Sequence, residues 1–203
     1  MKITALEALS LGVKNNSNSL PMDAYHSVVN KHIEETIDFF PCLTKIVHSC
    51  KVLPDNSLWL TYAVKGVLVT SEELKQRGIK PSDAKKYFDN YFNIYCIIPH
   101  TYKSVGCLVC DSNCFIKWER LPEEHCHINR KSTKYGNLLC THLYVEAKDM
   151  NNPVLENLKT AHDLAKAYVH YLKSKEWTLQ EYNHGKEGER EYYENRRLQN
   201  GVK

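Results

Sequence analysis

The sequence lacks a long apolar run, an excess of one charge and an internal repeat. A helix that spans a bilayer needs about 20 predominantly apolar residues. No stretch approaches this, so no membrane span is expected. Glu7 interrupts the apolar residues near the N-terminus, which argues against a secretory signal. The 27 basic and 24 acidic residues leave a net charge of +3, too small to indicate nucleic acid or an anionic membrane as a partner. We therefore expect a cytoplasmic protein that binds neither.

Apolar residues and cysteines, in contrast, are well represented. Of the 203 residues, 42% are hydrophobic, which is enough for the core of a single domain. The eight cysteines are many for this length: Cys42, Cys50, Cys96, Cys107, Cys110, Cys114, Cys126 and Cys140. Because no secretory signal is expected, thiols, a metal site or a catalytic thiol are favoured over a disulfide framework.

Hydrophobic periodicity predicts an α+β domain over residues 22–180. Residues 23–39 have helical spacing, with Asp23 as the expected N-cap and Pro41 just beyond the end. Strands are expected at 58–70, 91–99 and 105–110. The charged residues 71–89 are expected to form an excursion between strands, and an irregular segment is expected to lead to Cys140.

A long amphipathic helix is predicted after Pro153. Its apolar residues fall on one face: Leu155, Leu158, Ala161, Ala165, Tyr168 and Leu172. Outside the domain, residues 1–21 are predicted to be a flexible lead-in because they are rich in serine and asparagine toward their end. Residues 181–203 are predicted to be a charged tail, either a solvated helix or frayed chain.

The segment HCHINRKSTKYGNLLC, residues 125–140, carries most of the candidate chemistry. One interpretation is a structural zinc site. Its ligands would be Cys107, Cys110 and Cys114, with His125, Cys126 or His127 as the fourth. However, Cys107 and Cys110 lie in an apolar run typical of a strand, where residues three apart point to opposite faces. A second CxxC pair that could complete a four-cysteine site is also absent from the sequence.

A second interpretation is an HNH-type metal nuclease, in which a histidine-bearing hairpin precedes Asn-Leu-Leu-Cys and a final cysteine pair. The sequence GNLLCTH offers Asn137 and Cys140 but no closing CxxC. The chain also lacks the arginine-rich character expected of a protein that grips phosphates. The sequence therefore gives the nuclease interpretation little support.

A third interpretation treats Cys140 as a nucleophilic thiol at the end of a turn. Gly136 allows the chain to turn tightly before the cysteine, and His125, His127 and Asn129 lie on the preceding segment. A cysteine acyl carrier needs a thiol that reacts as the thiolate. It also needs an amide or imidazole donor for the oxyanion that forms when an amine attacks the thioester. The simpler alternative is that Cys140 is a buried apolar cysteine, since unmodified cysteine is among the most buried residue types.

The order of the expected elements favours the acyl carrier. Over about residues 23–175 the chain has a helix, a β-meander, Ile-Pro-x-x-Tyr ending at Tyr102, His127-Ile128-Asn129, then Gly136 and Leu-Cys, and finally helices. This order resembles the ubiquitin-conjugating enzyme family, with its Tyr-Pro pair, its His-Pro-Asn motif and its cysteine turn. Lys103 and Ile128 replace the two prolines, and the spacing from asparagine to cysteine is longer than in eukaryotic members.

The resemblance implies an α+β fold with an N-terminal helix, an antiparallel four-stranded meander and C-terminal helices. It further implies that Cys140 carries the thioester, that Asn129 supports the oxyanion and that the histidine braces the turn. In a shifted register, with His125-Cys126-His127 as the matching triplet, His127 would be the oxyanion donor. No cofactor is implied.

The activity implied by the resemblance is transfer of an acyl group from Cys140 to a lysine of a partner protein. The departures from the motifs are more similar to bacterial relatives, including those of cyclic-oligonucleotide anti-phage operons, which modify a nucleotidyltransferase. Such a nucleotidyltransferase, a ubiquitin-like modifier or an activating enzyme would then be the partners. The alternative of a different class is an inactive adaptor of the same fold that holds structural zinc.

Overall fold

Two long helices and an antiparallel sheet make up most of the described chain. The structure is a computed structural model that describes residues 21–88, 90–141 and 150–179, together with residues 190, 194 and 197. The predicted lead-in and tail lie almost wholly outside the described residues. Within those residues, the mixed α/β class, the N-terminal helix, the antiparallel sheet and the C-terminal helix are confirmed. No helix in the described ranges is long and apolar enough to cross a membrane.

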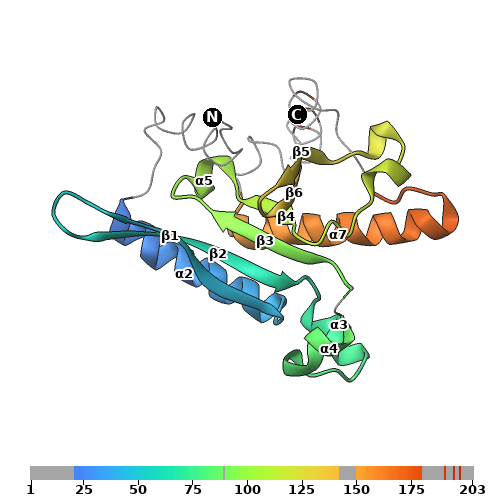
Figure 1. The fold of residues 1–203 in the computed structure, drawn as a ribbon, viewed down its shortest axis with the longest axis horizontal. Helices are drawn as coiled ribbons and strands as arrows, with labels where there is room; N and C mark the ends of the chain where they lie inside the picture. The colour runs from blue at the N-terminus through green and yellow to red at the C-terminus, as the bar shows by residue number, and fades with distance from the viewer. Residues whose placement is uncertain are drawn as a thin grey trace.

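The sheet has six strands in the order β1-β2-β3-β4-β6-β5, and every neighbouring pair is antiparallel. The strands are β1 (Leu43–Val52), β2 (Leu58–Val67), β3 (Asn93–Ile98), β4 (Leu108–Asp111), β5 (Ile128–Thr133) and β6 (Gly136–Leu139). The first four follow one another as the expected meander (Figure 1). The prediction of four strands is incomplete, because the segment expected to be irregular contributes the β5–β6 hairpin at the other edge. The sequence did not predict β1, which is an edge strand whose side chains are mostly exposed.

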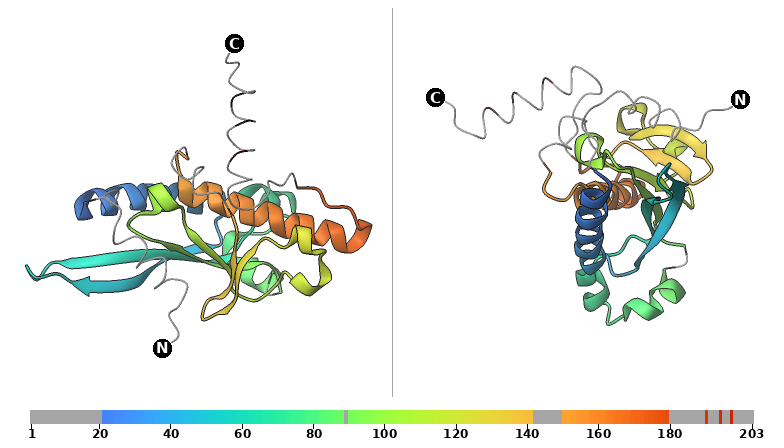
Figure 2. Two further views of the ribbon diagram at one scale, coloured as in Figure 1. Left: turned by 90° about the horizontal axis from the view of Figure 1, so that it is seen from above. Right: turned by 90° about the vertical axis from the view of Figure 1, so that its left-hand side faces the viewer.

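The helices α2 (Met22–Phe39) and α7 (Pro153–Ser174) cover the same face of the sheet, as both views in Figure 2 make clear. The two helices and the sheet share one hydrophobic core. Among its fully buried members are Tyr25 and Ile33 of α2, Val64, Ile94 and Val109 of the sheet, and Leu158 and Ala161 of α7. Burial of each large aliphatic or aromatic side chain contributes about 1.5–3 kcal/mol. This layer of helices on one sheet face supports the strands that carry the candidate site.

The start of α2 differs from the prediction. The N-cap is Pro21, which makes no side-chain cap bond, and the helix begins at Met22. Asp23 as the N-cap is therefore wrong. It lies in the first turn instead, where a carboxylate is favoured by the helix dipole. The predicted end is correct, because α2 stops at Phe39 before Pro41.

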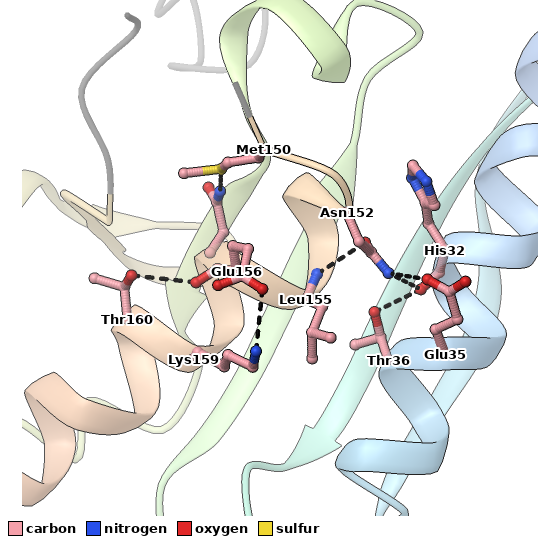
Figure 3. A network of polar contacts seen from close by, with 10 residues as sticks. His32, Glu35, Thr36, Met150, Asn152, Leu155, Glu156, Lys159 and Thr160 are labelled. Carbon is pink, nitrogen blue, oxygen red and sulfur yellow. Dashed lines mark hydrogen bonds and ion pairs between the residues drawn. The ribbon is translucent and has the colours of Figure 1, made fainter. Parts of the chain in front are cut away.

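Asn152 caps α7 and ties it to α2 (Figure 3). Its Oδ1 accepts a hydrogen bond from the Leu155 backbone N–H at 3.1 Å, and Pro153 follows at the first helical position. Its Nδ2 donates to the His32 carbonyl at 3.0 Å and to Glu35 Oε2 at 2.8 Å. One buried side chain thus starts the C-terminal helix and joins it to the N-terminal one.

Residues between β2 and β3 form the predicted excursion. It consists of α3 (Ser71–Gln76), the 3-10 turn η1 (Pro81–Asp83) and α4 (Ala84–Tyr87). Thr70 and Glu73 form a capping box at the start of α3, in which each side chain accepts a hydrogen bond from the backbone N–H of the other residue. The excursion has a small apolar cluster of its own, which includes Leu74 and Phe88. The buried cluster of the excursion is therefore separate from the main core.

Candidate functional site at the end of the hairpin

The β5–β6 hairpin brings the residues of segment 125–140 together. Ile128 of β5 lies opposite Leu139 of β6. The register shifts between Ile128 and Arg130, so that Asn129 lies in an irregularity of the strand. A bulge of this kind redirects a side chain from the regular alternation. Asn129 is thereby placed beside the end of β6, where Cys140 follows.

Two hydrogen bonds fix the backbone around Cys140. The Cys140 N–H donates to the His127 carbonyl at 3.0 Å. Asn129 Nδ2 donates to the Leu139 carbonyl at 3.2 Å. Cys140 is half-buried. His127, Asn129 and Cys140 therefore belong to one hydrogen-bonded unit, in which the asparagine amide is held next to the cysteine.

Gly136 makes the close approach of β6 to β4 possible. Its φ is +105°, a conformation that residues with a side chain rarely adopt. A Cβ at this position would also collide with the Asp111 carbonyl of β4. Glycine is therefore required for two independent reasons at the start of the strand that leads to Cys140.

Asn157 of α7 anchors the residue that follows Cys140. Its Oδ1 accepts hydrogen bonds from the Thr141 hydroxyl at 3.1 Å and from the Cys107 backbone N–H at 3.3 Å, and its Nδ2 donates to Met150 Sδ at 3.5 Å. Asn157 is fully buried. Sequence analysis missed it, although an asparagine beside the apolar face of a helix was a usable signal, because buried amides are nearly always hydrogen-bonded.

Trp177 packs against the histidines of the segment. Its indole ring stacks on His125 with a centroid distance of 4.6 Å and an interplanar angle of 8°, and it lies parallel to His127 at 6.3 Å. Tyr171 of α7 meets both His125 and Trp177 edge-on. His125 is thus directed toward the end of α7. No sequence spacing indicated Trp177, because its contact with the segment arises only when α7 crosses the sheet.

Tyr102, the tyrosine of the Ile-Pro-x-x-Tyr segment, is a core residue. It begins the short helix α5 (Tyr102–Val105) and is fully buried. Its hydroxyl is 2.9 Å from His32 Nδ1 of α2. Burial, with the charge of Lys103 adding to it, lowers the pKa of His32. A neutral imidazole suits this contact, which links the meander to α2.

The cysteines proposed as zinc ligands are not gathered into one site. Cys107 faces the main core, as Val109 does. Cys110 of β4 is one residue further along, so it points to the opposite face of the sheet. Cys126 Sγ lies 3.5 Å from the Pro122 carbonyl. The described ranges contain no group of three or more histidine, cysteine or carboxylate side chains able to hold a metal. Neither the zinc nor the nuclease interpretation gains support from them.

Three of the other thiols have raised pKa values. A hydrogen bond with Cys107, together with complete burial, raises the pKa of Cys96 well above its ordinary value. Burial raises the pKa of Cys110 to about 12 and also raises the pKa of Cys42. Thiols of this kind are poor nucleophiles at neutral pH, because the thiolate is the reactive form.

No protein-family model, curated protein or solved structure matches this chain.

Proposed function

We propose that the protein is a cysteine-dependent acyltransferase of the ubiquitin-conjugating type, with Cys140 as the acyl carrier. The observation that carries this proposal is the hydrogen bond from Asn129 Nδ2 to the Leu139 carbonyl, which holds an amide donor beside the half-buried Cys140. The helix, meander and helix order supports it as well, because it provides the same sequence of elements that the family has.

The chemistry divides into two acyl transfers. In the first, the Cys140 thiolate attacks an activated acyl group, a thioester forms on Sγ, and the donor's leaving group departs with its electron pair. In the second, a lysine amine attacks the thioester carbonyl, the C–S bond breaks, the Cys140 thiolate leaves and the amine loses a proton as the amide forms. Negative charge develops on the carbonyl oxygen in the tetrahedral intermediate of each transfer.

Asn129 is suited to stabilise this charge. A carboxamide has two N–H donors, and one of them is used by the Leu139 carbonyl. The second can donate to the oxyanion without reorganising the turn. The Cys140 backbone N–H is not available for this role, because it already donates to the His127 carbonyl. His127 remains the other candidate for the oxyanion donor.

The partners follow from the resemblance rather than from the geometry. They are a ubiquitin-like modifier or activating enzyme that supplies the acyl group, and a lysine-bearing protein that receives it. In a bacterial anti-phage operon the receiving protein would be a cyclic-nucleotide-producing nucleotidyltransferase, and the reaction would take place in the cytoplasm.

A single-turnover assay with a small peptide thioester tests the proposal. Thioester formation and its discharge to free lysine are followed by intact mass. Cys140→Ala should abolish loading while the protein stays folded. Asn129→Ala should slow discharge about 10²–10³ times, the usual cost of removing one oxyanion donor, and should slow discharge more than loading.

Two further variants complete the test. Asn151→Ala, a change at an exposed asparagine, should load and discharge like the parent protein. His127→Ala should lower loading and discharge together if the histidine braces the turn. If it instead slows discharge much more than loading, His127 is the oxyanion donor. A Cys140 thiol that forms no thioester under any condition would refute the transferase and favour the inactive adaptor.

A further inference from the structure

A groove runs along the face of α7 that lies beside the excursion. Its volume is about 570 Å³, within the range of roughly 300–1,000 Å³ typical of small-molecule sites. We call it the α7 groove. It is lined by Glu73, Arg77, Tyr91, Phe115, His162, Asp163, Ala165, Lys166, Ala167, Val169, His170, Lys173, Thr178 and Leu179. Cys140 is not among the residues that line it.

Three cations of the α7 groove have no acidic partner among the described residues. Arg77, Lys166 and Lys173 make no ion pair within 4 Å with any residue of the described ranges. Glu73, the groove's most buried acid, is already satisfied, because its carboxylate lies 3.0 Å from His162 Nε2 and also accepts from the Thr70 backbone. Asp163, the other acid of the groove, lies 3.7 Å from His162 Nδ1. Three cations against two carboxylates leave the groove with a small excess of positive charge that an anion would balance.

Two aromatic rings line the α7 groove. The Tyr91 and Phe115 rings are 6.0 Å apart and tilted by 44°, and both are half-buried. Tyr91 also packs edge-on against Phe88 of the excursion, so its ring is held from the side. Partly exposed aromatic rings stack on planar ligands, and each base stacked in this way contributes about 1–3 kcal/mol.

We propose that the α7 groove binds a small anion that carries a planar ring, of the nucleoside monophosphate class. The ring lies against Tyr91 and Phe115, and the phosphate is bound by the cations of the groove. The proposal rests on aromatic and unpaired basic side chains that meet in one cavity, and it is independent of any reaction at Cys140.

Calorimetric titration of the full chain separates the two parts of this ligand. The probes are AMP, adenosine and inorganic phosphate at low ionic strength. AMP should bind at least about tenfold more tightly than either fragment, because only AMP uses the rings and the cations together. Raising the salt concentration should weaken the binding of AMP and leave the binding of adenosine nearly unchanged, because salt screens the contact between the phosphate and the cations.

Variants locate the binding. Lys166→Ala should weaken AMP about tenfold, the effect of one charge-assisted hydrogen bond. Lys159→Ala is the matched control, because Lys159 is also on α7 but pairs with Glu156 outside the groove. Tyr91→Leu should weaken AMP and adenosine alike, with circular dichroism used to verify that the variant is folded.

Three outcomes would overturn the proposal. The first is the absence of any heat of binding with AMP at millimolar concentration. The second is an equal loss of AMP affinity in Lys166→Ala and Lys159→Ala. The third is tighter binding of an oligoglutamate peptide than of AMP. The last would assign the groove to an acidic protein segment instead.

Discussion

At the scale of single residues, the eight cysteines occupy very different environments. Cys96 and Cys110 are buried in the sheet, and the pKa of each thiol is raised. Cys140 is half-buried at a strand end, and Cys50 is exposed on β1. Reactivity therefore should follow position in the sheet rather than position in a motif.

Alkylation tests this at the residue scale. With iodoacetamide at pH 7 we expect Cys140 to be modified well before Cys96 and Cys110. With a pKa of about 12, Cys110 is thiolate in only about one molecule in 10⁵ at this pH. Cys50 competes because it is exposed, so peptide mapping is best done in a Cys50→Ser background. Labelling of Cys140 as slow as that of Cys96 would exclude it as an acyl carrier.

At the scale of elements, α2 and α7 are joined through one buried asparagine. Replacing Asn152 with alanine removes the cap of α7 and the two bonds to α2. We expect the free energy of unfolding to fall by about 1–3 kcal/mol. Asn152→Ser should recover the helix cap but not the bonds to α2, so its stability should lie between those of the parent protein and Asn152→Ala. Asn151→Ala should change the free energy of unfolding by less than about 0.5 kcal/mol. Urea titrations measure all three, and an unchanged Asn152→Ala would mean that the link contributes no net stability.

The excursion and α7 are joined by the pair Glu73 and His162, which makes their contact dependent on pH. Burial alone would raise the pKa of Glu73. The hydrogen bonds from His162 and Thr70 outweigh it and lower this pKa from 4.5 to about 2. A depressed pKa means that the stabilisation is fully present above pH 4.5 and is lost as the pH falls toward 2.

Glu73→Gln is the corresponding variant. We expect it to be less stable than the parent protein at pH 6. The difference should shrink at pH 3, where the carboxyl group of the parent is largely protonated in the unfolded state. Because Glu73 is partly exposed, solvent screening reduces the effect. A difference that is the same at both pH values would show that the ionised carboxylate is not responsible.

At the scale of the whole molecule, the excursion is separable from the main core. The buried members of that core include Leu68 and Phe92 but none of the residues between them. The Leu68 N–H donates to the Phe92 carbonyl at 2.9 Å, so the two ends of the excursion are adjacent. A short turn could therefore join β2 directly to β3.

Replacing residues 69–91 with Asn-Gly should leave a cooperative fold of lower stability. The loss reflects three contacts: the Glu73 contact with His162, the hydrogen bond from Ser71 Oγ to the Asp38 carbonyl, and the packing of Tyr91 on the main core. Affinity for AMP should disappear, because Arg77 and Tyr91 are removed. Thermal unfolding followed by circular dichroism is the measurement, and loss of the cooperative transition would mean that the excursion is required for folding.

The sequence by itself determined the elements whose signal is local. The helical periods that begin near Met22 and Pro153, and the β-branched runs of β2 to β4, each depend on neighbours within a few residues. Gly136 was likewise recognisable, because its role follows from its missing side chain. The segment 125–140 was identified from residue types alone, although its hairpin was not.

Only the tertiary structure decided how these parts meet. The β5–β6 register places Asn129 beside Leu139, α7 brings Asn157 to Thr141, and Trp177 reaches His125. The α7 groove is likewise formed by residues from Glu73 to Leu179. Such contacts depend on strand register and on how α7 lies on the sheet. Both follow from burial of the whole core at once, so these contacts leave no periodic signal in the sequence.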